Sequence, residues 1–144
     1  MDPIKFETEK HEKYTYIKLN EEKLTTTNSP QLKTEFVNLN AEGRTYIILD
    51  LQNVNYADSS GLSSLLVANR LFNANGGLFM ICGLTSHVEK LVKISQLDTV
   101  LNIVPTKQEG IDAIFMAHLE NDVDEDELSS EIMDEFGSLE GPGE

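Results

Sequence analysis

The sequence predicts one α/β domain, built on a mixed sheet, followed by an acidic tail. Residues 46–51 and 78–82 are nearly continuous apolar runs, which are typical of strands covered on both faces. Helical patterns lie between and after these runs, and two β-rich segments precede them. This order predicts an N-terminal hairpin, a mixed β-sheet with parallel crossovers and about four helices packed against the sheet.

The first part of the chain contains the hairpin and one helix. Residues 5–9 and 14–19 are roughly alternating, and the charged stretch 10–13 separates them. Asn28-Ser29-Pro30 then predicts a helix start, with an N-cap residue and a proline near the first helical position. The helix is expected to stop at Glu42-Gly43, and its apolar positions follow at helical spacing: Leu32, Phe36 and Leu39.

Strands and helices alternate in the rest of the domain. The helix between the two apolar runs ends at residues 75–77, and its stripe is Leu62, Leu65, Leu66, Asn69 and Phe72. The next helix is capped by Thr85 or Ser86 and carries Val88, Leu91 and Val92. A short strand is predicted at residues 101–104, and the last helix presents Ile111, Ile114, Phe115 and His118.

The acidity of the protein belongs to its C-terminal segment. The 144 residues carry a formal net charge of −14, of which residues 1–118 contribute −3 and residues 119–144 contribute −11. We therefore predict a domain over 1–118 and an acidic tail over 119–144, disordered or forming a short amphipathic helix. The amphipathic helix is suggested by Leu128, Ile132 and Phe136, which are spaced four residues apart.

Composition excludes several classes of protein. A nucleic-acid interface would need a basic patch, which the sequence lacks. No apolar run approaches the roughly 18 residues of a membrane span, and the first residues do not resemble a signal peptide. Cys82 is the single cysteine and the three histidines are scattered, so we expect no disulfide and no metal site. A cytoplasmic protein is expected.

The densest polar cluster is Asp58-Ser59-Ser60-Gly61, which follows a buried strand and opens a helix. One interpretation is structural, because Asp58, Ser59 and Ser60 are all acceptable N-caps and glycine permits close backbone approach. The other is a phosphorylation site, since the free amides of a helix N-terminus tolerate phosphate while Asp58 would add like-charge repulsion.

The segment from Ile48 to Leu62 resembles the signature of STAS domains, the family of anti-sigma-factor antagonists. Strand, short loop, Asp-Ser-Ser-Gly-Leu turn and leucine-rich helix stand in the order of that family, and the resemblance continues through residues 4–118. One departure is the loop before the first helix, where Thr25-Thr26-Thr27 stand in place of the usual acidic, small-residue motif.

The resemblance implies a partner-switching role without catalysis. Ser59 would be the residue that an anti-sigma factor with serine kinase activity phosphorylates, with Ser60 as the second choice. The unphosphorylated protein would bind that kinase and the phosphorylated protein would be released, with a phosphatase as the partner that resets the site. The ATP belongs to the kinase, so the chain is expected to carry no cofactor. The partner-facing residues would be Asp58, Ser59, Ser60, Gly61, Ser63, Ser64, Val67 and Arg70.

Three alternatives remain at this stage. Some STAS domains are regulatory subunits of membrane transporters or lipid-transport ATPases and have no phosphorylation cycle. A receiver domain would use Asp50 as phosphoacceptor, but such a domain does not open with a hairpin. A serine hydrolase would need a histidine beside Ser59 or Ser60, and the nucleophile-elbow pattern is absent.

Overall fold

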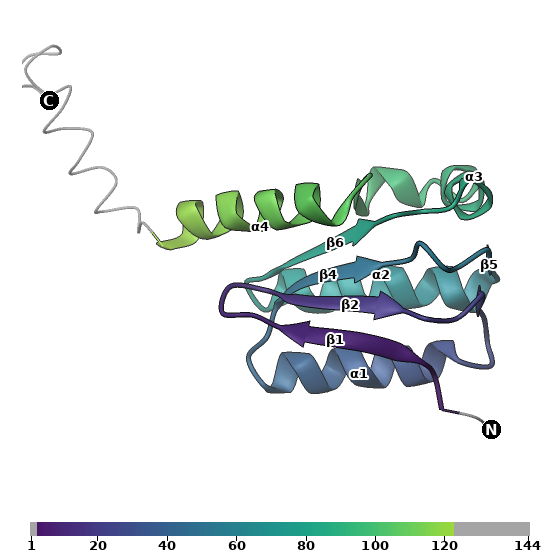
Figure 1. Cartoon of the computed structure of the whole chain (residues 1–144), viewed down its shortest axis with the longest axis horizontal. Helices are drawn as coiled ribbons and strands as arrows, with labels where there is room; N and C mark the ends of the chain where they lie inside the picture. The colour runs from purple at the N-terminus through teal and green to yellow at the C-terminus, as the bar shows by residue number, and fades with distance from the viewer. Residues whose placement is uncertain (1–2, 123–144) are drawn as a thin grey trace, which may run out of the picture. The chain divides into compact units, whose positions relative to one another are not determined.

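The computed structural model describes residues 3–122 and confirms the predicted mixed α/β architecture. Five strands form one sheet in the order β1-β2-β4-β6-β7. Figure 1 shows β1, β2, β4 and β6 following one another in this order. β1 pairs with β2 in an antiparallel manner and the other three pairings are parallel. The bounds of these strands are β1 Phe6–Lys10, β2 Thr15–Leu19, β4 Tyr46–Asp50, β6 Leu78–Cys82 and β7 Asn102–Val104.

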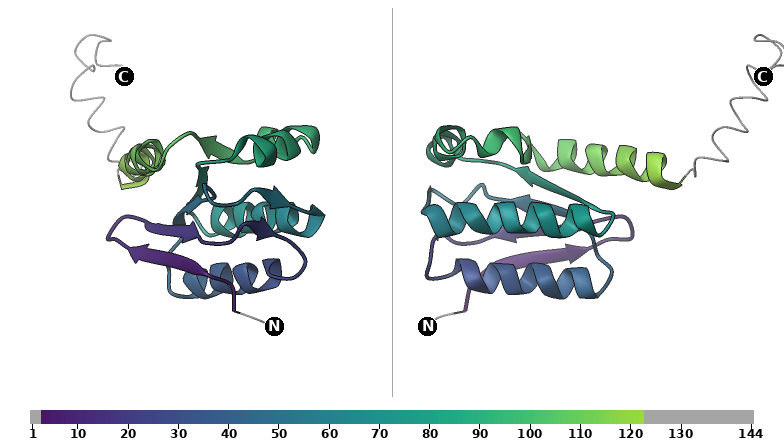
Figure 2. Two further views of the ribbon diagram at one scale, coloured as in Figure 1. Left: turned by 45° about the vertical axis from the view of Figure 1, so that its right-hand side comes forward. Right: turned by 180° about the vertical axis from the view of Figure 1, so that it is seen from behind.

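Residues 3–122 also form four α-helices and one 3-10 helix. Their bounds are α1 Ser29–Ala41, α2 Ser59–Ala74, α3 Ser86–Ile94, η1 Leu97–Thr99 and α4 Lys107–Asp122. Figure 2 shows α1 and α2 side by side on one face of the sheet. The chain divides within α4 into two units, residues 1–114 and residues 115–144, and the site described below belongs to the first.

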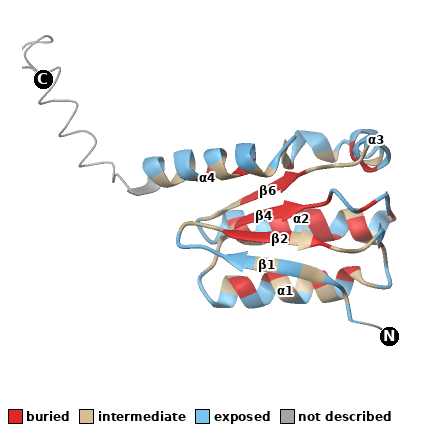
Figure 3. Ribbon diagram, in the orientation of Figure 1, coloured by how far each residue is buried: buried red, intermediate tan, exposed pale blue. Residues whose placement is uncertain are grey.

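The alternation of side chains along β4 and β6 explains why both strands read as continuous apolar runs. Ile47 and Leu49 face a core shared with α1, α2 and α3, whereas Ile48 faces a smaller cluster completed by Ile114 of α4. Figure 3 shows the central strands as the buried part of the sheet and β1 as a largely exposed strand. Burial on both faces removes the need for polar positions.

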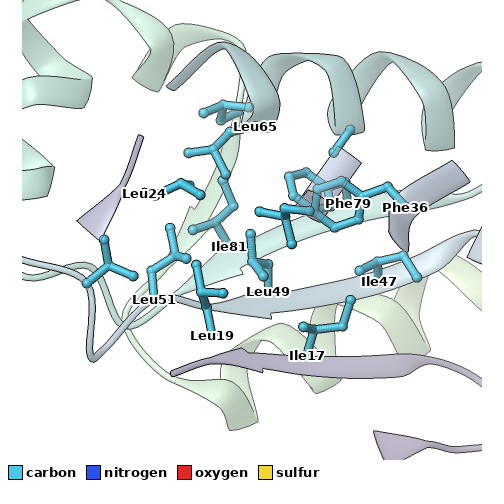
Figure 4. Packing of buried hydrophobic residues seen from close by; sticks show 14 of the residues in the cluster. Ile17, Leu19, Leu24, Phe36, Ile47, Leu49, Leu51, Leu65, Phe79 and Ile81 are labelled. Carbon is cyan, nitrogen blue, oxygen red and sulfur yellow. The ribbon is translucent and has the colours of Figure 1, made fainter. Parts of the chain in front are cut away.

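Three phenylalanines fill the centre of the larger core. Phe36 of α1 meets the rings of Phe72 and Phe79 edge to face, at centroid distances of 5.7 and 5.6 Å. Figure 4 shows Phe36 and Phe79 close together among the apolar side chains of the sheet. These contacts place α1 and α2 on the same face, because rings from both helices and from β6 interlock.

The structure adds two strands that the sequence did not predict. β3 Lys23–Leu24 and β5 Tyr56–Ala57 form a separate parallel pair, with Lys23 opposite Tyr56 and Leu24 opposite Ala57. Two residues are too few for an alternating pattern to be recognised. Their pairing matters for function, because the carboxyl ends of parallel strands lie side by side and two loops therefore meet.

Several predicted boundaries are sharpened. Thr85 rather than Ser86 caps α3, and its hydroxyl accepts from the Val88 amide. Asn28 occupies the cap position of α1, but its side chain bonds to the backbone of Lys23 in β3 and of Thr25 in the loop, and not to the helix amides. α4 continues to Asp122, past the predicted His118, because no glycine or proline interrupts the sequence there. The possible helix around Leu128 lies outside the described residues.

Candidate functional site

Asp58 is the N-cap of α2, so the structural interpretation of the polar turn is confirmed. Its backbone is extended, and its Oδ1 accepts a hydrogen bond of 2.9 Å from the Gly61 amide. This bond satisfies one of the helix amides that would otherwise lack a partner. The cap fixes where α2 begins and therefore which serine stands on its first turn.

Thr26 reaches the same carboxylate from the loop between β3 and α1. Its amide and its hydroxyl lie 3.0 and 3.1 Å from Oδ2 of Asp58, and its Oγ1 is 3.0 Å from Oγ of Ser60. The β3–β5 pairing produces this contact, since Thr26 follows β3 and Asp58 follows β5. Sequence reasoning noted the threonine-rich loop but missed this role, because 32 residues separate Thr26 from Asp58.

The hydrogen bonds keep Asp58 ionised. The Gly61 amide and then the Thr26 amide lower the pKa of the Asp58 carboxyl below its usual value, and the hydrogen bonds together outweigh the opposing effect of burial. A carboxylate that accepts several N–H bonds is stabilised in its charged form. The turn therefore carries a fixed negative charge beside the two serines.

Ser59 and Ser60 differ in environment. Ser59 is exposed, and its hydroxyl makes no hydrogen bond to another residue in the described part of the chain. Ser60 is half-buried and its hydroxyl contacts Thr26. Ser59 is thus the serine whose side chain is directly accessible to an approaching protein.

The outer face of α2 extends this accessible surface. Ser63, Val67 and Arg70 are exposed, and Val67 leaves 38% of its surface open. Ser59, Ser63 and Val67 stand four residues apart and so share one face of the helix. These three residues form what we call the α2 outer face.

Two predictions about α2 are wrong. Ser64 was predicted to face a partner, but it is fully buried and its hydroxyl donates to the carbonyl of Gly61 at 2.6 Å. Leu66 was predicted as part of the apolar stripe that packs on the core, but it is half-buried and lies outside both core clusters. The reason is helical register: Ser64 lies on the face of α2 that is buried, and Leu66 lies beside that face. The buried residues of α2 are Gly61, Ser64, Leu65, Ala68, Asn69 and Phe72.

The surroundings of the turn do not form a catalytic triad. His87, at the start of α3, stacks on the exposed ring of Tyr56 with 6.0 Å between centroids. No hydrogen bond joins His87 to Ser59 or Ser60 within residues 3–122. A serine nucleophile needs a hydrogen-bonded base, so the geometry does not favour the hydrolase alternative.

Asp50 is buried and cannot serve as the exposed phosphoacceptor of a receiver domain. It ends β4, is 3% exposed, and its carboxylate accepts from the Tyr16 hydroxyl at 2.5 Å and from the side-chain and backbone nitrogens of Gln52 at 2.8 and 3.0 Å. Desolvation, and then the bond to Asp50, raise the pKa of Tyr16. These contacts tie β2 to β4 and give Asp50 a structural role.

The described residues contain neither a metal-binding cluster nor a membrane-spanning helix. Between residues 3 and 122, no three side chains of His, Cys, Asp or Glu are placed to hold a metal ion. In the same range, no helix combines the length and apolar character needed to cross a bilayer.

Fold and site together define a mixed α/β domain with an accessible serine at the start of α2. The family model for the STAS domain matches residues 5–110, so the chain belongs to the STAS family. Among curated proteins it is similar to the anti-sigma F factor antagonist of Paenibacillus polymyxa, with 34% identity over 58 residues. That segment covers 40% of this chain and spans only half the length of the relative.

Solved structures share the fold. An anti-sigma factor antagonist from Mycobacterium paratuberculosis superposes with a TM-score of 0.69 at 18% identity, covering 77% of this chain and 93% of that one. The Bacillus cell fate determinant SpoIIAA, in its phosphorylated form, gives a TM-score of 0.60 at 22% identity, covering 76% and 99%. At such identities the likeness describes the fold.

Proposed function

We propose that this protein is an anti-sigma-factor antagonist that works by partner switching. In its unmodified form it binds an anti-sigma factor with serine kinase activity, and phosphorylation of Ser59 releases it. The observation that carries the proposal is the exposed Ser59 hydroxyl on the first turn of α2, beside the ionised and capped Asp58. The name of the curated relative supports the class of partner.

The geometry suggests how a phosphate would act. A phosphoserine adds a charge of about −1.5 to −2, and here it would stand next to the negative charge of Asp58. The hydrogen bonds of Asp58 keep that carboxylate charged, so the two charges cannot be relieved by protonation near neutral pH. A partner surface that tolerates one negative charge at this turn would therefore be repelled by the modified protein.

The chain acts as a substrate in this scheme and not as an enzyme. The kinase supplies ATP and the phosphoryl-transfer machinery, while this chain supplies the Ser59 hydroxyl and the α2 outer face. Ser63 and Val67 extend the contact beyond the modified residue. Because the proposed kinase uses ATP, the exchange belongs in the cytoplasm, and a phosphatase would restore the binding form.

The test uses the full chain and each anti-sigma factor with a kinase domain encoded in its source genome. With ATP, mass mapping is expected to place phosphate on Ser59. Ser59→Ala should keep binding but lose ATP-dependent release. Ser59→Asp should weaken binding by about a hundredfold or more, because like charges at an interface cost several kcal/mol and every 1.4 kcal/mol is about tenfold in affinity. Ser63→Ala is the matched control and should still be released.

Two results would contradict the proposal. Binding of Ser59→Asp as tight as that of the wild type would show that charge at this position does not control the interface. Stable co-purification with a transporter or a lipid-transport ATPase, without phosphate on Ser59, would favour the regulatory-subunit alternative.

A further inference from the structure

The Thr26 hydroxyl sits between two groups of the turn. Its Oγ1 is 3.1 Å from Oδ2 of Asp58 and 3.0 Å from Oγ of Ser60. A hydroxyl has one proton and a carboxylate can only accept, so the proton of Thr26 points to Asp58. Ser60 must then donate its own proton to Thr26. The result is a chain of two hydrogen bonds from Ser60 through Thr26 to Asp58.

This chain treats the two adjacent serines differently. The Ser60 proton is directed at Thr26, and the Ser60 side chain is held toward the β3–α1 loop. Ser59 has no such partner among the described residues and is exposed. A serine that accepts a phosphoryl group must turn its Oγ toward the donor and give up its proton, which the bond to Thr26 opposes at Ser60.

We propose that Thr26 is a positioning residue that restrains Ser60 and thereby directs phosphorylation to Ser59. The inference rests on the proposed function, because it concerns the choice between two serines for the same modification. It also gives a role to the threonine-rich loop, which departs from the usual loop of the family at this place.

Substitutions at residues 26 and 27 can separate the effect of the Thr26 hydroxyl from that of the rest of the loop. Thr26→Val removes the hydroxyl but keeps the shape of the side chain and the backbone amide that bonds to Asp58 at 3.0 Å. Thr26→Ser restores a hydroxyl. Thr27→Val is the matched control, because Thr27 is an exposed neighbour whose hydroxyl makes no hydrogen bond to Asp58 or Ser60.

The first measurement is the site of phosphorylation by the anti-sigma kinase with ATP. In a Ser59→Ala background, Thr26→Val should raise the rate of Ser60 phosphorylation by about two- to tenfold, the factor that corresponds to the net worth of one hydrogen bond. Thr26→Ser and Thr27→Val should leave that rate unchanged. An unchanged or lower rate in Thr26→Val would overturn the inference, and a lower rate would mean that Thr26 activates Ser60 instead.

The second measurement needs no kinase. A double-mutant cycle on urea unfolding should couple Thr26→Val to Ser60→Ala, with a factor of about two to ten in the unfolding equilibrium constant. The same cycle with Ser59→Ala should be additive. Coupling of Thr26 to Ser59 and not to Ser60 would overturn the inference.

The two proposals fail in different ways. If no kinase places phosphate on the wild-type chain, the switching function fails and the choice between serines fails with it. If the wild type is phosphorylated but Thr26→Val leaves the rate of Ser60 phosphorylation in the Ser59→Ala background unchanged, only the role of Thr26 fails.

Discussion

Gly61→Ala should disrupt the candidate site through the backbone. A Cβ at position 61 would lie 2.0 Å from the carbonyl oxygen and 2.8 Å from the carbonyl carbon of Leu24 in β3. Both neighbours are backbone atoms, so no side-chain rotation relieves the contact. β3 and the first turn of α2 must therefore separate, and the 3.2 Å bond from the Asp58 amide to the Leu24 oxygen would be lost with them.

The magnitude follows from these two effects. Overpacking a close contact costs about 1–3 kcal/mol, and losing one backbone hydrogen bond adds about 0.5–1.5 kcal/mol. We expect Gly61→Ala to lower the free energy of unfolding by about 2–4 kcal/mol. The assay is urea unfolding monitored by far-UV circular dichroism, because the chain has no tryptophan whose fluorescence could report unfolding.

Gly110→Ala is the matched control with the opposite sign. A Cβ at Gly110, in the first part of α4, would meet the side chain of Ile48 at 3.5 Å, an ordinary contact. Because alanine favours a helix over glycine, this variant should be more stable by about 0.5–1 kcal/mol. If Gly61→Ala loses less than about 1 kcal/mol, the close packing of β3 on α2 is not what requires glycine there.

Two further predictions concern ionisable groups. The pKa of Asp58 is lower in the folded protein than in the unfolded chain. The ionised carboxylate therefore stabilises the fold at pH values above the unfolded-state pKa, and this stabilisation is lost as the pH falls through the folded-state pKa. The stability gap between the wild type and Asp58→Asn should therefore shrink from pH 7 toward acid, and a gap independent of pH would contradict the hydrogen-bonded carboxylate. For Cys82, which is buried in β6, desolvation raises the thiol pKa to about 12. The folded protein should resist an aromatic disulfide reagent at a pH of about 8 while the urea-unfolded chain reacts fully, and rapid labelling of the folded protein would be the contrary result.

The sequence predicted those parts of the fold that carry a repeating pattern. The apolar runs at residues 46–51 and 78–82 identified the central strands. A strand that is buried on both faces is mostly apolar at consecutive positions, and this makes it recognisable in the sequence. The polar turn was found because cap residues followed a strand and preceded a leucine-rich helix. In each case the signal is local and covers several consecutive residues.

The parts that were missed depend on contacts between distant segments. The β3–β5 pair is two residues long on each side, and the bond from Thr26 to Asp58 requires that pair to form first. The burial of Ser64 likewise depends on which side of α2 faces α1 and the sheet, and the spacing of the leucines does not decide that. Sequence patterns locate the turn, and tertiary pairing determines which of its neighbours complete it.

Asp50 and Asp58 show the same distinction within one residue type. Both follow or end short strands and both were candidates for chemistry on sequence grounds. Asp50 is 3% exposed and is held by Tyr16 and Gln52, so its carboxylate joins strands of the sheet. Asp58 is half-buried and is held by Gly61 and Thr26, so it positions a turn that remains open to solvent. Unlike Asp50, Asp58 has an accessible hydroxyl beside it, that of Ser59, and the proposed switch depends on this hydroxyl.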